Sequence, residues 1–234
     1  MNKVFIIAEA GVNHNGSFDR AISMIKIAKQ AGADAVKFQT AVPELVMIKN
    51  AEKAAYQLQT TSKNESQLEM AKKIHLPLHS FKDLRKECDN KKIEFMSTAF
   101  DDMSIKILKE VGLKRWKIPS GEITNLPYLR QVGAMKRPVI MSTGMATLKE
   151  TKNAADILFD AGLKRNFLTI LHCNTEYPTP ANDVNLKAML TLRKELKVEV
   201  GYSDHTLGFE VSIAAAAMGA AIIEKHFTLD RSLP

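Results

Sequence analysis

The chain has 234 residues, of which 45% are hydrophobic and 25% charged, so we expect a globular protein of one large or two small domains. No apolar run approaches the roughly 20 residues that cross a bilayer, so we expect a non-membrane protein. The net charge is +7, but the basic residues alternate with acidic ones and form no aromatic-interleaved stripe, which argues against nucleic acid as a partner. Cys88 and Cys173 lie far apart without metal-type spacing, which predicts a reducing, cytoplasmic location and no disulfide framework.

Short β-branched or apolar runs recur along the chain, and each ends in polar residues or glycine. These runs predict strands at 4–9, 35–39, 93–98, 115–121, 138–144, 167–173, 198–203 and 221–227. Amphipathic stretches between them predict helices at 20–31, 104–111, 149–161, 186–196 and 208–218. Several of these helices run into glycine, which suits a left-handed terminus before the next strand.

The alternation of strands and helices predicts an α/β fold, a (β/α)8 TIM-type barrel, with residues 1–234 forming one catalytic barrel domain. The longest insertion, roughly 41–80, predicts one or two helices. After the eighth strand only T-L-D-R-S-L-P remains, so we expect a barrel that is truncated there. An open doubly wound sheet is the alternative, but G-V-N-H-N-G does not match the dinucleotide-binding fingerprint that it would need.

Polar residues stand at the end of every predicted strand, where TIM barrels carry their chemistry. The hydrogen-bond donors among them are Lys37, Thr98, Lys117, Ser120, Ser142 and Ser203. A buried lysine is costly unless it is paired or functional, although single residues could serve as structural salt bridges. Two ammonium groups and several hydroxyls predict a site for a phosphate or a phosphorylated carboxylate.

The stretch V-G-Y-S-D-H-T (200–206) holds a serine, an aspartate and a histidine in a row. Adjacent residues on an extended chain point to opposite sides, which argues against a nucleophilic triad. His205 and His226 end the seventh and eighth strands, and two imidazoles there can hold a divalent ion. His172 competes as a ligand, or is a rim histidine bonded to backbone.

With these residues the sequence resembles the sialic acid synthase family along nearly its whole length. The resembling stretches are A-E-A-G-V-N-H-N-G-S, A-V-K-F-Q-T, E-S-Q-L-E-M, W-K-I-P-S-G-E, S-T-G-M-A-T, L-H-C-N-T-E-Y-P-T-P, S-D-H-T and I-E-K-H-F-T-L-D. The resemblance implies a TIM-type barrel followed by a small antifreeze-like domain, which this chain does not contain. It also implies a cytoplasmic homodimer when full length, in which the partner's small domain closes the barrel.

The resemblance further implies a reaction of sialic acid biosynthesis. Phosphoenolpyruvate condenses with N-acetylmannosamine, an N-acetylated hexosamine, and water to give N-acetylneuraminate and phosphate, in a transferase that uses Mn2+ or Mg2+. By motif, the metal ligands would be His205 and His226, and the phosphoenolpyruvate site Lys37, Thr98, Lys117, Ser120, Ser142 and Ser203. The sugar site would be Gln39, Glu122, Thr175 and Tyr177, and the catalytic glutamates Glu9 and Glu122. Some members have asparagine in place of Thr175.

Three alternatives remain open. A sister synthase would make a legionaminic- or pseudaminic-type acid from another acetamido sugar with the same strand-end residues. A Schiff-base aldolase on the same fold would use Lys37 or Lys117 as its nucleophile. A non-catalytic sugar-binding domain would be expected to lack the metal and phosphate groups that this sequence retains.

Overall fold

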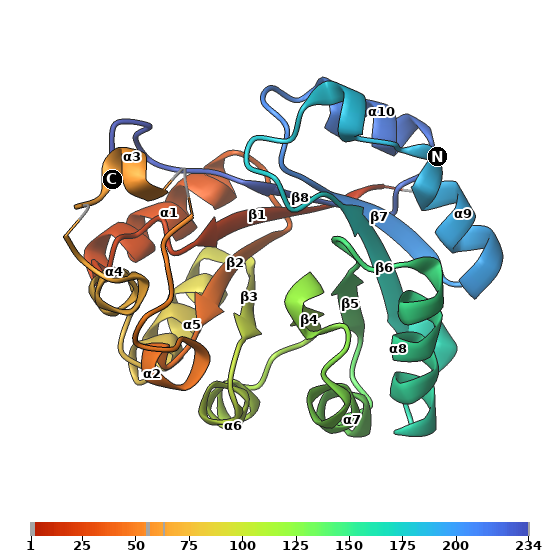
Figure 1. The fold of residues 1–234 in the computed structure, drawn as a ribbon, viewed down its shortest axis with the longest axis horizontal. Coiled ribbons are helices and arrows are strands. Elements are labelled where there is room, and N and C mark those ends of the chain that lie inside the picture. The colour runs from red at the N-terminus through yellow and green to blue at the C-terminus, as the bar shows by residue number, and fades with distance from the viewer. Residues whose placement is uncertain (1–2, 55–56, 63, 234) are drawn as a thin grey trace. The chain divides into compact units, whose positions relative to one another are not determined.

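A computed structural model describes residues 3–54, 57–62 and 64–233 of the chain. Within these ranges eight parallel strands form a closed barrel in sequence order (Figure 1), which confirms the predicted (β/α)8 fold. The strands are β1 (Phe5–Gly11), β2 (Ala35–Thr40), β3 (Glu94–Ala99), β4 (Trp116–Ile118), β5 (Val139–Ser142), β6 (Leu168–Cys173), β7 (Glu199–Asp204) and β8 (Ile222–His226). Each overlaps a predicted run.

Two strands end two or three residues earlier than the sequence predicts. β4 ends before Pro119, which precedes a 3-10 turn at Ser120–Glu122. β5 ends at Ser142, because Gly144 has a φ of +53° and turns the chain out of the extended conformation.

The five predicted helices are confirmed, with first residues that differ from the prediction by at most two positions. They are α1 (Phe18–Gln30), α6 (Asp102–Val111), α8 (Leu148–Asp160), α9 (Lys187–Leu196) and α10 (Glu210–Ala217). The glycines expected to end helices have positive φ, for example +79° at Gly112. Left-handed termini also occur at Lys92 and Lys197, where the residue type gives no such signal.

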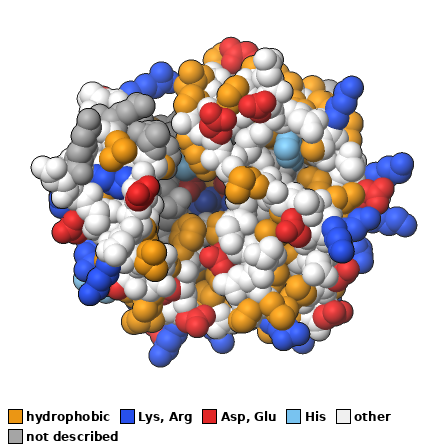
Figure 2. All heavy atoms as spheres, viewed as in Figure 1, with side chains coloured by type: hydrophobic (Ala, Val, Ile, Leu, Met, Phe, Trp, Pro, Cys, Tyr) orange, Lys and Arg blue, Asp and Glu red, His pale blue; other side chains and the backbone are white. Residues whose placement is uncertain are grey.

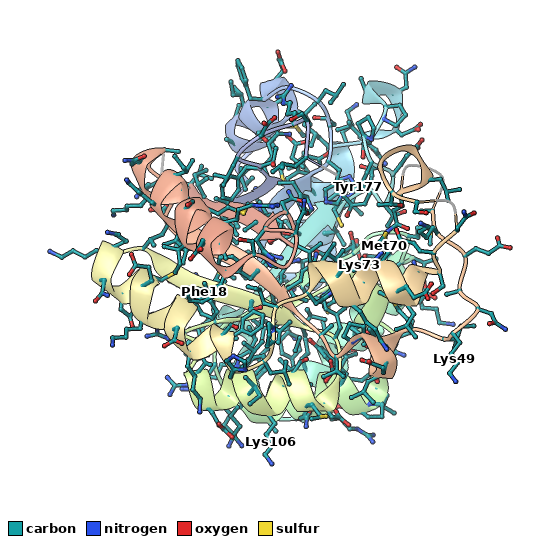
Figure 3. The ribbon with its side chains drawn as sticks, turned by 90° about the vertical axis from the view of Figure 1, so that its left-hand side faces the viewer. Phe18, Lys49, Met70, Lys73, Lys106 and Tyr177 are labelled. Atoms are coloured by element: carbon teal, nitrogen blue, oxygen red, sulfur yellow. The ribbon has the colours of Figure 1, made fainter. Side chains whose placement is uncertain are left out.

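The insertion after β2 contains more helices than the one or two predicted. In the described part of it lie α2 (Pro43–Val46), α3 (Gln57–Thr60) and α4 (Gln67–Ile74), and α5 (Ser80–Lys91) follows. α2 and α3 have four residues each, too few for a hydrophobic period. Met70 and Lys73 lie on α4 (Figure 3), the first buried and the second paired with Glu65.

Helix α7 (Leu126–Ala134) has no counterpart in the sequence prediction. Its N-cap is Asn125, whose side chain accepts a hydrogen bond from the backbone N–H of Tyr128, and the helix contains Gly133. A Cβ at Gly133 would lie 2.8 Å from both Ala161 Cβ and Leu158 O, so the glycine lets α7 pack closely against α8. Gly133 therefore weakens the helical pattern in the sequence, and the close packing of α7 against α8 requires it.

The chain divides into two compact units. The first unit comprises Met1–Ile7 and Lys114–Lys225, and in it α7 packs against α8, and α9 against β6 and β7. The second unit comprises Ala8–Leu113 and His226–Pro234, and in it α1 packs against α5, with both helices along β2 and β3 (Figure 1). The rings of Phe38 and Phe95, 6.0 Å apart, belong to the core of the second unit.

Basic side chains satisfy carbonyl groups where helices end. Four backbone carbonyls at or next to helix C-termini accept such bonds: Lys29 to Lys92 O (2.8 Å), Arg85 to Gly112 O (2.7 Å), Arg165 to Leu196 O (2.8 Å) and Arg193 to Gly219 O. The last carbonyls of a helix otherwise lack partners, and cations there also meet the negative end of its dipole. On the face drawn in Figure 2, Lys and Arg side chains lie among Asp and Glu. None of the helices that the structure describes is long and apolar enough to cross a membrane.

Candidate active site

Five predicted site residues lie in the second unit, and we call them the Lys37 cluster: Glu9, Lys37, Gln39, Thr98 and His226. Lys37 Nζ lies 2.7 Å from Glu9 Oε2 and donates to Thr98 Oγ1 at 3.2 Å, and Gln39 Nε2 donates to Glu9 Oε1 at 3.5 Å. The side chains of Lys37 and Glu9 are 4% and 2% exposed, so this is a buried ion pair. It supplies the counter-charge that a buried ammonium requires.

Gly11 shapes the Lys37 cluster without a side chain. Its φ is +53°, and a Cβ there would lie 3.4 Å from Glu9 Oε1, 3.6 Å from Gln39 Nε2 and 3.7 Å from His226 Cε1. The His226 ring therefore lies on the same side of Gly11 as the carboxylate and the amide. The chain after His226 is held by two hydrogen bonds, from Phe227 N to Glu9 O and from Asn13 Nδ2 to Phe227 O.

The first unit holds a similar group, which we call the Lys117 cluster: Lys117, Ser203, His205 and Glu224. Lys117 Nζ lies 3.2 Å from Glu224 Oε1, and Ser203 Oγ donates to the same oxygen at 2.9 Å. The side chains of Lys117 and Glu224 are 5% and 6% exposed. The sequence prediction gave Glu224 no role, because the pairing depends on the register that places Ser203 opposite Glu224.

His205 is held by the loop that follows β6. Its Nδ1–H donates to Asn174 O at 2.6 Å, its ring lies 4.2 Å from the ring of Tyr177, and its Nε2 is 3.5 Å from Ser203 Oγ. Burial lowers the pKa of His205 more than the Asn174 hydrogen bond and the Glu224 charge raise it. A neutral imidazole with its proton on Nδ1 carries its lone pair on Nε2, which is the state that binds a metal.

Ser120, Ser142 and Thr175 line the turn after β5. A Cβ at Gly144 would lie 2.6 Å from Ser120 Oγ and 3.1 Å from Thr175 Cγ2, so both side chains pack against the backbone of Gly144. Ser142 is buried beside Cys173, which accepts a hydrogen bond from Gly144 N at 3.2 Å. Burial raises the pKa of the Cys173 thiol, which disfavours a nucleophilic role for it.

Two residues differ from the rest in their surroundings. Glu122 is half-buried in the 3-10 turn after β4, and its carboxylate accepts a hydrogen bond from Asn125 Nδ2 at 2.6 Å. His172 bonds to Val184 O at 2.8 Å, and its ring lies 5.6 Å from that of Tyr202. His172 is therefore the backbone-bonded histidine of the two alternatives.

The metal assignment is compatible with the surroundings of each histidine taken separately. His205 has the tautomer that a ligand needs, and His226 is exposed beside Glu9 and Gln39. No group of three or more His, Cys, Asp or Glu side chains suited to a metal was found among the described residues.

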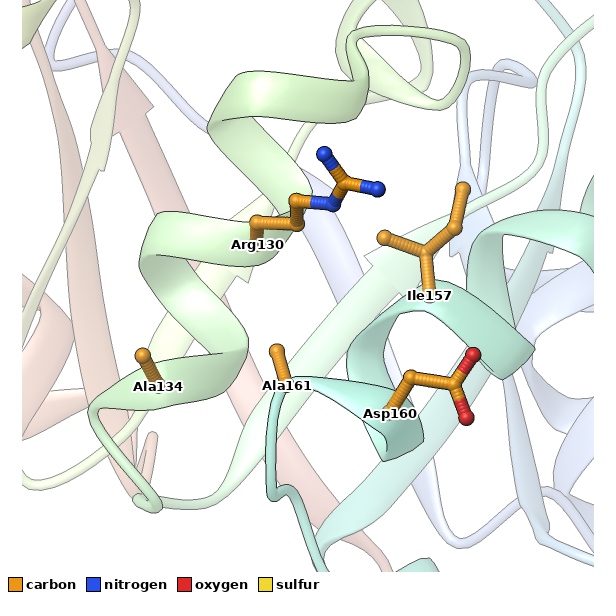
Figure 4. Close-up of a pocket in the computed structure, with 5 residues that line it drawn as sticks. All are labelled: Arg130, Ala134, Ile157, Asp160 and Ala161. Atoms are coloured by element: carbon orange, nitrogen blue, oxygen red, sulfur yellow. The ribbon is translucent and has the colours of Figure 1, made fainter.

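A separate pocket lies between the outer helices α7 and α8. Figure 4 shows its lining, in which Arg130 extends from α7 toward Ile157 of α8. The lining residues are Arg130, Ala134, Ile157, Asp160 and Ala161. None of them belongs to the predicted site, and the lining does not resemble the lysine–carboxylate clusters.

Comparisons with known proteins identify the family of the chain. The NeuB family model matches residues 24–234. The chain is 52% identical to the N,N'-diacetyllegionaminic acid synthase of Campylobacter jejuni over all of its own length and 70% of that protein. It is 49% identical to the protein of the same name from Legionella pneumophila, over 98% of this chain and 65% of that protein. The solved N-acetylneuraminic acid synthetase of Leptospira borgpetersenii, a complex with citrate, superimposes with a TM-score of 0.86 at 35% identity, covering 99% of this chain and 75% of that one. The chain belongs to the NeuB family of sialic-acid-type synthases.

Proposed function

We propose that this chain carries the catalytic residues of a synthase that condenses phosphoenolpyruvate with an acetamido sugar to give a legionaminic-type acid and phosphate. The observation that carries the proposal is the pair of buried lysine–carboxylate clusters at the ends of barrel strands. Each cluster contains an ammonium group and a hydroxyl, Thr98 with Lys37 and Ser203 with Lys117, and such donors bind a phosphate or a carboxylate.

The choice of sugar follows from the relatives. Both proteins at about half identity are named diacetyllegionaminic acid synthases, whereas the N-acetylneuraminic acid synthetase is 35% identical. They favour the alternative substrate over N-acetylmannosamine. A nine-carbon product with two N-acetyl groups requires a six-carbon diacetamido sugar as the partner of phosphoenolpyruvate.

The chain's residues would divide the work as follows. Lys37 and Thr98, and Lys117 with Ser203, would hold the anionic groups of phosphoenolpyruvate, joined by Ser120 and Ser142. Gln39, Glu122, Thr175 and Tyr177 would contact the sugar. These ammonium groups would also stabilise charge on the phosphate as it leaves.

His205 and His226 would hold the divalent ion, Mn2+ or Mg2+. When bound, such an ion polarises the sugar aldehyde and stabilises the alkoxide that forms from it. The imidazoles contribute by presenting their ring nitrogens.

The bond changes balance without a further reactant. Carbon 3 of phosphoenolpyruvate attacks the aldehyde carbon and forms the new carbon–carbon bond. Water adds to the cation left at carbon 2, and Glu9 or Glu122 accepts one of its protons, which the alkoxide takes up to become the new hydroxyl. The carbon–oxygen bond to phosphate then breaks as the hydroxyl on carbon 2 becomes the ketone and gives its proton to the departing phosphate. Glu9 lies beside Lys37 and on the His226 side of Gly11, and Glu122 lies in the 3-10 turn that precedes α7.

The aldolase alternative would require Lys37 or Lys117 to leave its ion pair and attack pyruvate as a free amine. Borohydride treatment in the presence of pyruvate should yield no covalent adduct, and an adduct on Lys37 or Lys117 would support the aldolase instead.

One assay tests the proposal. Phosphate release from phosphoenolpyruvate is measured with a diacetamido-trideoxyhexose and with N-acetylmannosamine, with and without Mn2+. We expect metal-dependent release that is faster with the diacetamido sugar. Equal or faster release with N-acetylmannosamine would refute the choice of sugar, and no release with any acetamido sugar would refute the synthase. The homodimer and the cytoplasmic location stay predictions, and light scattering would test the first.

A further inference from the structure

Asp204, the last residue of β7, is a buried hydrogen-bond centre between Ser203 and His205. Its side chain is 0% exposed. Its Oδ2 accepts from Ser212 Oγ (2.5 Å) and lies 2.9 Å from Lys225 Nζ, and its Oδ1 accepts from Thr206 N (2.9 Å) and Thr206 Oγ1 (2.7 Å). One carboxylate thus ties β7 to the following turn, to α10 and to β8.

Two polar pairs join the ends of β7 and β8 on opposite faces. Ser203 lies opposite Glu224, and Asp204 lies opposite Lys225. Because successive residues of a strand point to opposite sides, the Asp204–Lys225 ion pair lies behind the Ser203–Glu224 hydrogen bond. Together they fix the register of the two strands at their last paired residues.

The backbone on both sides of His205 is held by the same ion pair. Asp204 precedes the histidine, and Thr206 follows it with its N–H on Asp204 and its carbonyl accepting from Lys225 Nζ at 2.9 Å. Asp204 makes no hydrogen bond to the His205 ring, whose Nδ1 bonds to Asn174 O. The ion pair therefore holds the backbone from which the imidazole projects. The loop after β6 holds the rotation of the imidazole ring about its side-chain bonds.

We propose that Asp204 and Lys225 form a positioning pair for His205, so that affinity for a divalent cation depends on this ion pair. The inference rests on the proposed function, which gives His205 its role as a metal ligand. Groups that orient metal ligands typically change metal affinity by about 10–100-fold when they are replaced.

The test measures Mn2+ binding to the protein by the EPR signal of free Mn2+. The variants are Asp204→Asn, Lys225→Gln and the double variant, each with a urea unfolding curve. We expect each single change to weaken Mn2+ binding at least tenfold. The double variant should bind about as weakly as the weaker single variant, because both changes break one interaction. Lys225 is 30% exposed, so its replacement retains the fold even where Asp204→Asn fails to fold.

Asp101 provides a matched control in the second unit. It also follows a strand and collects hydrogen bonds: its carboxylate accepts from Ser104 N (2.8 Å), Ser104 Oγ (2.6 Å) and Val42 N (2.8 Å). Asp101→Asn should lower stability and leave Mn2+ affinity within twofold of the wild type. If Asp204→Asn and Lys225→Gln also left it within twofold, the pair would have a structural role alone and the inference would be overturned.

A second readout requires no metal. The 15N shifts of the His205 ring report its tautomer, and we expect the Nδ1-protonated form in wild type and a mixture of tautomers in Asp204→Asn. Wild-type shifts in that variant would count against the positioning role.

The two proposals fail separately. Wild-type protein that binds Mn2+ and loses it in the variants, yet releases no phosphate, would refute the synthase and retain the positioning pair. Phosphate release by the wild type, together with unchanged Mn2+ affinity in the variants, would support the synthase and refute the positioning pair. Wild-type protein that binds no Mn2+ would overturn the positioning pair together with the metal role of the histidines.

Discussion

Removal of the Glu224 carboxylate should destabilise the protein far more than removal of a surface carboxylate. Glu224→Ala leaves the ammonium of Lys117 buried without its counter-charge, and both side chains are 6% exposed or less. Loss of one partner of such a pair costs about 3–5 kcal/mol. At roughly 2–4 °C per kcal/mol for a chain of this size, the Tm should fall by about 6–20 °C.

The surface pair Lys152–Glu195 is the matched comparison. Its N–O distance is 2.7 Å, shorter than that of the buried pair, but its side chains are 43% and 36% exposed. Exposed pairs contribute about 0–1 kcal/mol, so Glu195→Ala should change the free energy of unfolding by no more than that. The double replacement Lys117→Met with Glu224→Leu removes both charges and should recover most of the stability lost in Glu224→Ala.

Urea unfolding of the variants, at a constant slope m, gives the free energies directly. Equal losses for Glu224→Ala and Glu195→Ala would refute the reasoning, because burial would then have no effect. Addition of phosphate at matched ionic strength extends the test. If Lys117 belongs to an anion site, phosphate should raise the stability of Glu224→Ala more than that of the wild type, since a bound anion replaces the missing charge.

Three further predictions concern other residues. Gly11→Ala should lower stability by about 1–2 kcal/mol, because φ is +53° there, as measured by urea unfolding. Burial raises the pKa of Cys88 to about 12 and also raises that of Cys173, so DTNB at pH 8 should label neither thiol before urea is added. Burial and nearby positive charge lower the pKa of His14 to about 4, so the unfolded chain binds a proton there that the folded chain does not. Stability should therefore fall as pH drops from about 6.5 to about 4, by up to ~3 kcal/mol, and His14→Gln should flatten that slope.

Local signals in the sequence were sufficient for most of the fold. The strands are short β-branched runs, and several helices end at glycines such as Gly112, whose φ is +79°. Helix α7 was missed because its cause is tertiary: Gly133 weakens the helical pattern and permits the contact with Leu158 and Ala161. The same holds for the left-handed Lys92, which side-chain chemistry does not distinguish from any other lysine.

For the candidate site, residue types at strand ends identified Lys37 and Lys117 but not what neutralises them. Glu9 was expected to act on water, and the structure pairs it with Lys37 at 2.7 Å. The role of Glu224 follows only from the register of β7 and β8. The alternation of side chains along each strand does not determine how the two strands are aligned with each other. Tyr177 was expected at the sugar, and its ring lies 4.2 Å from that of His205. The sequence predicted which residue types stand at the strand ends. It did not predict which side chains from different strands and loops pair with one another.

The two lysine–carboxylate pairs solve a problem that any buried anion site must solve when it is empty. An ammonium without a counter-charge is too costly to bury, yet the site must be able to take up an anion. In each unit a carboxylate resolves this, Glu9 for Lys37 and Glu224 for Lys117, with a hydroxyl from Thr98 or Ser203 in the same network. Each carboxylate stabilises the protein without an anion and repels an anion that binds to the lysine. Replacement of either carboxylate should therefore lower the stability and raise the anion affinity. Measured together on one variant, those two quantities separate a substrate site from an ordinary buried salt bridge, because a structural pair has no anion affinity to gain.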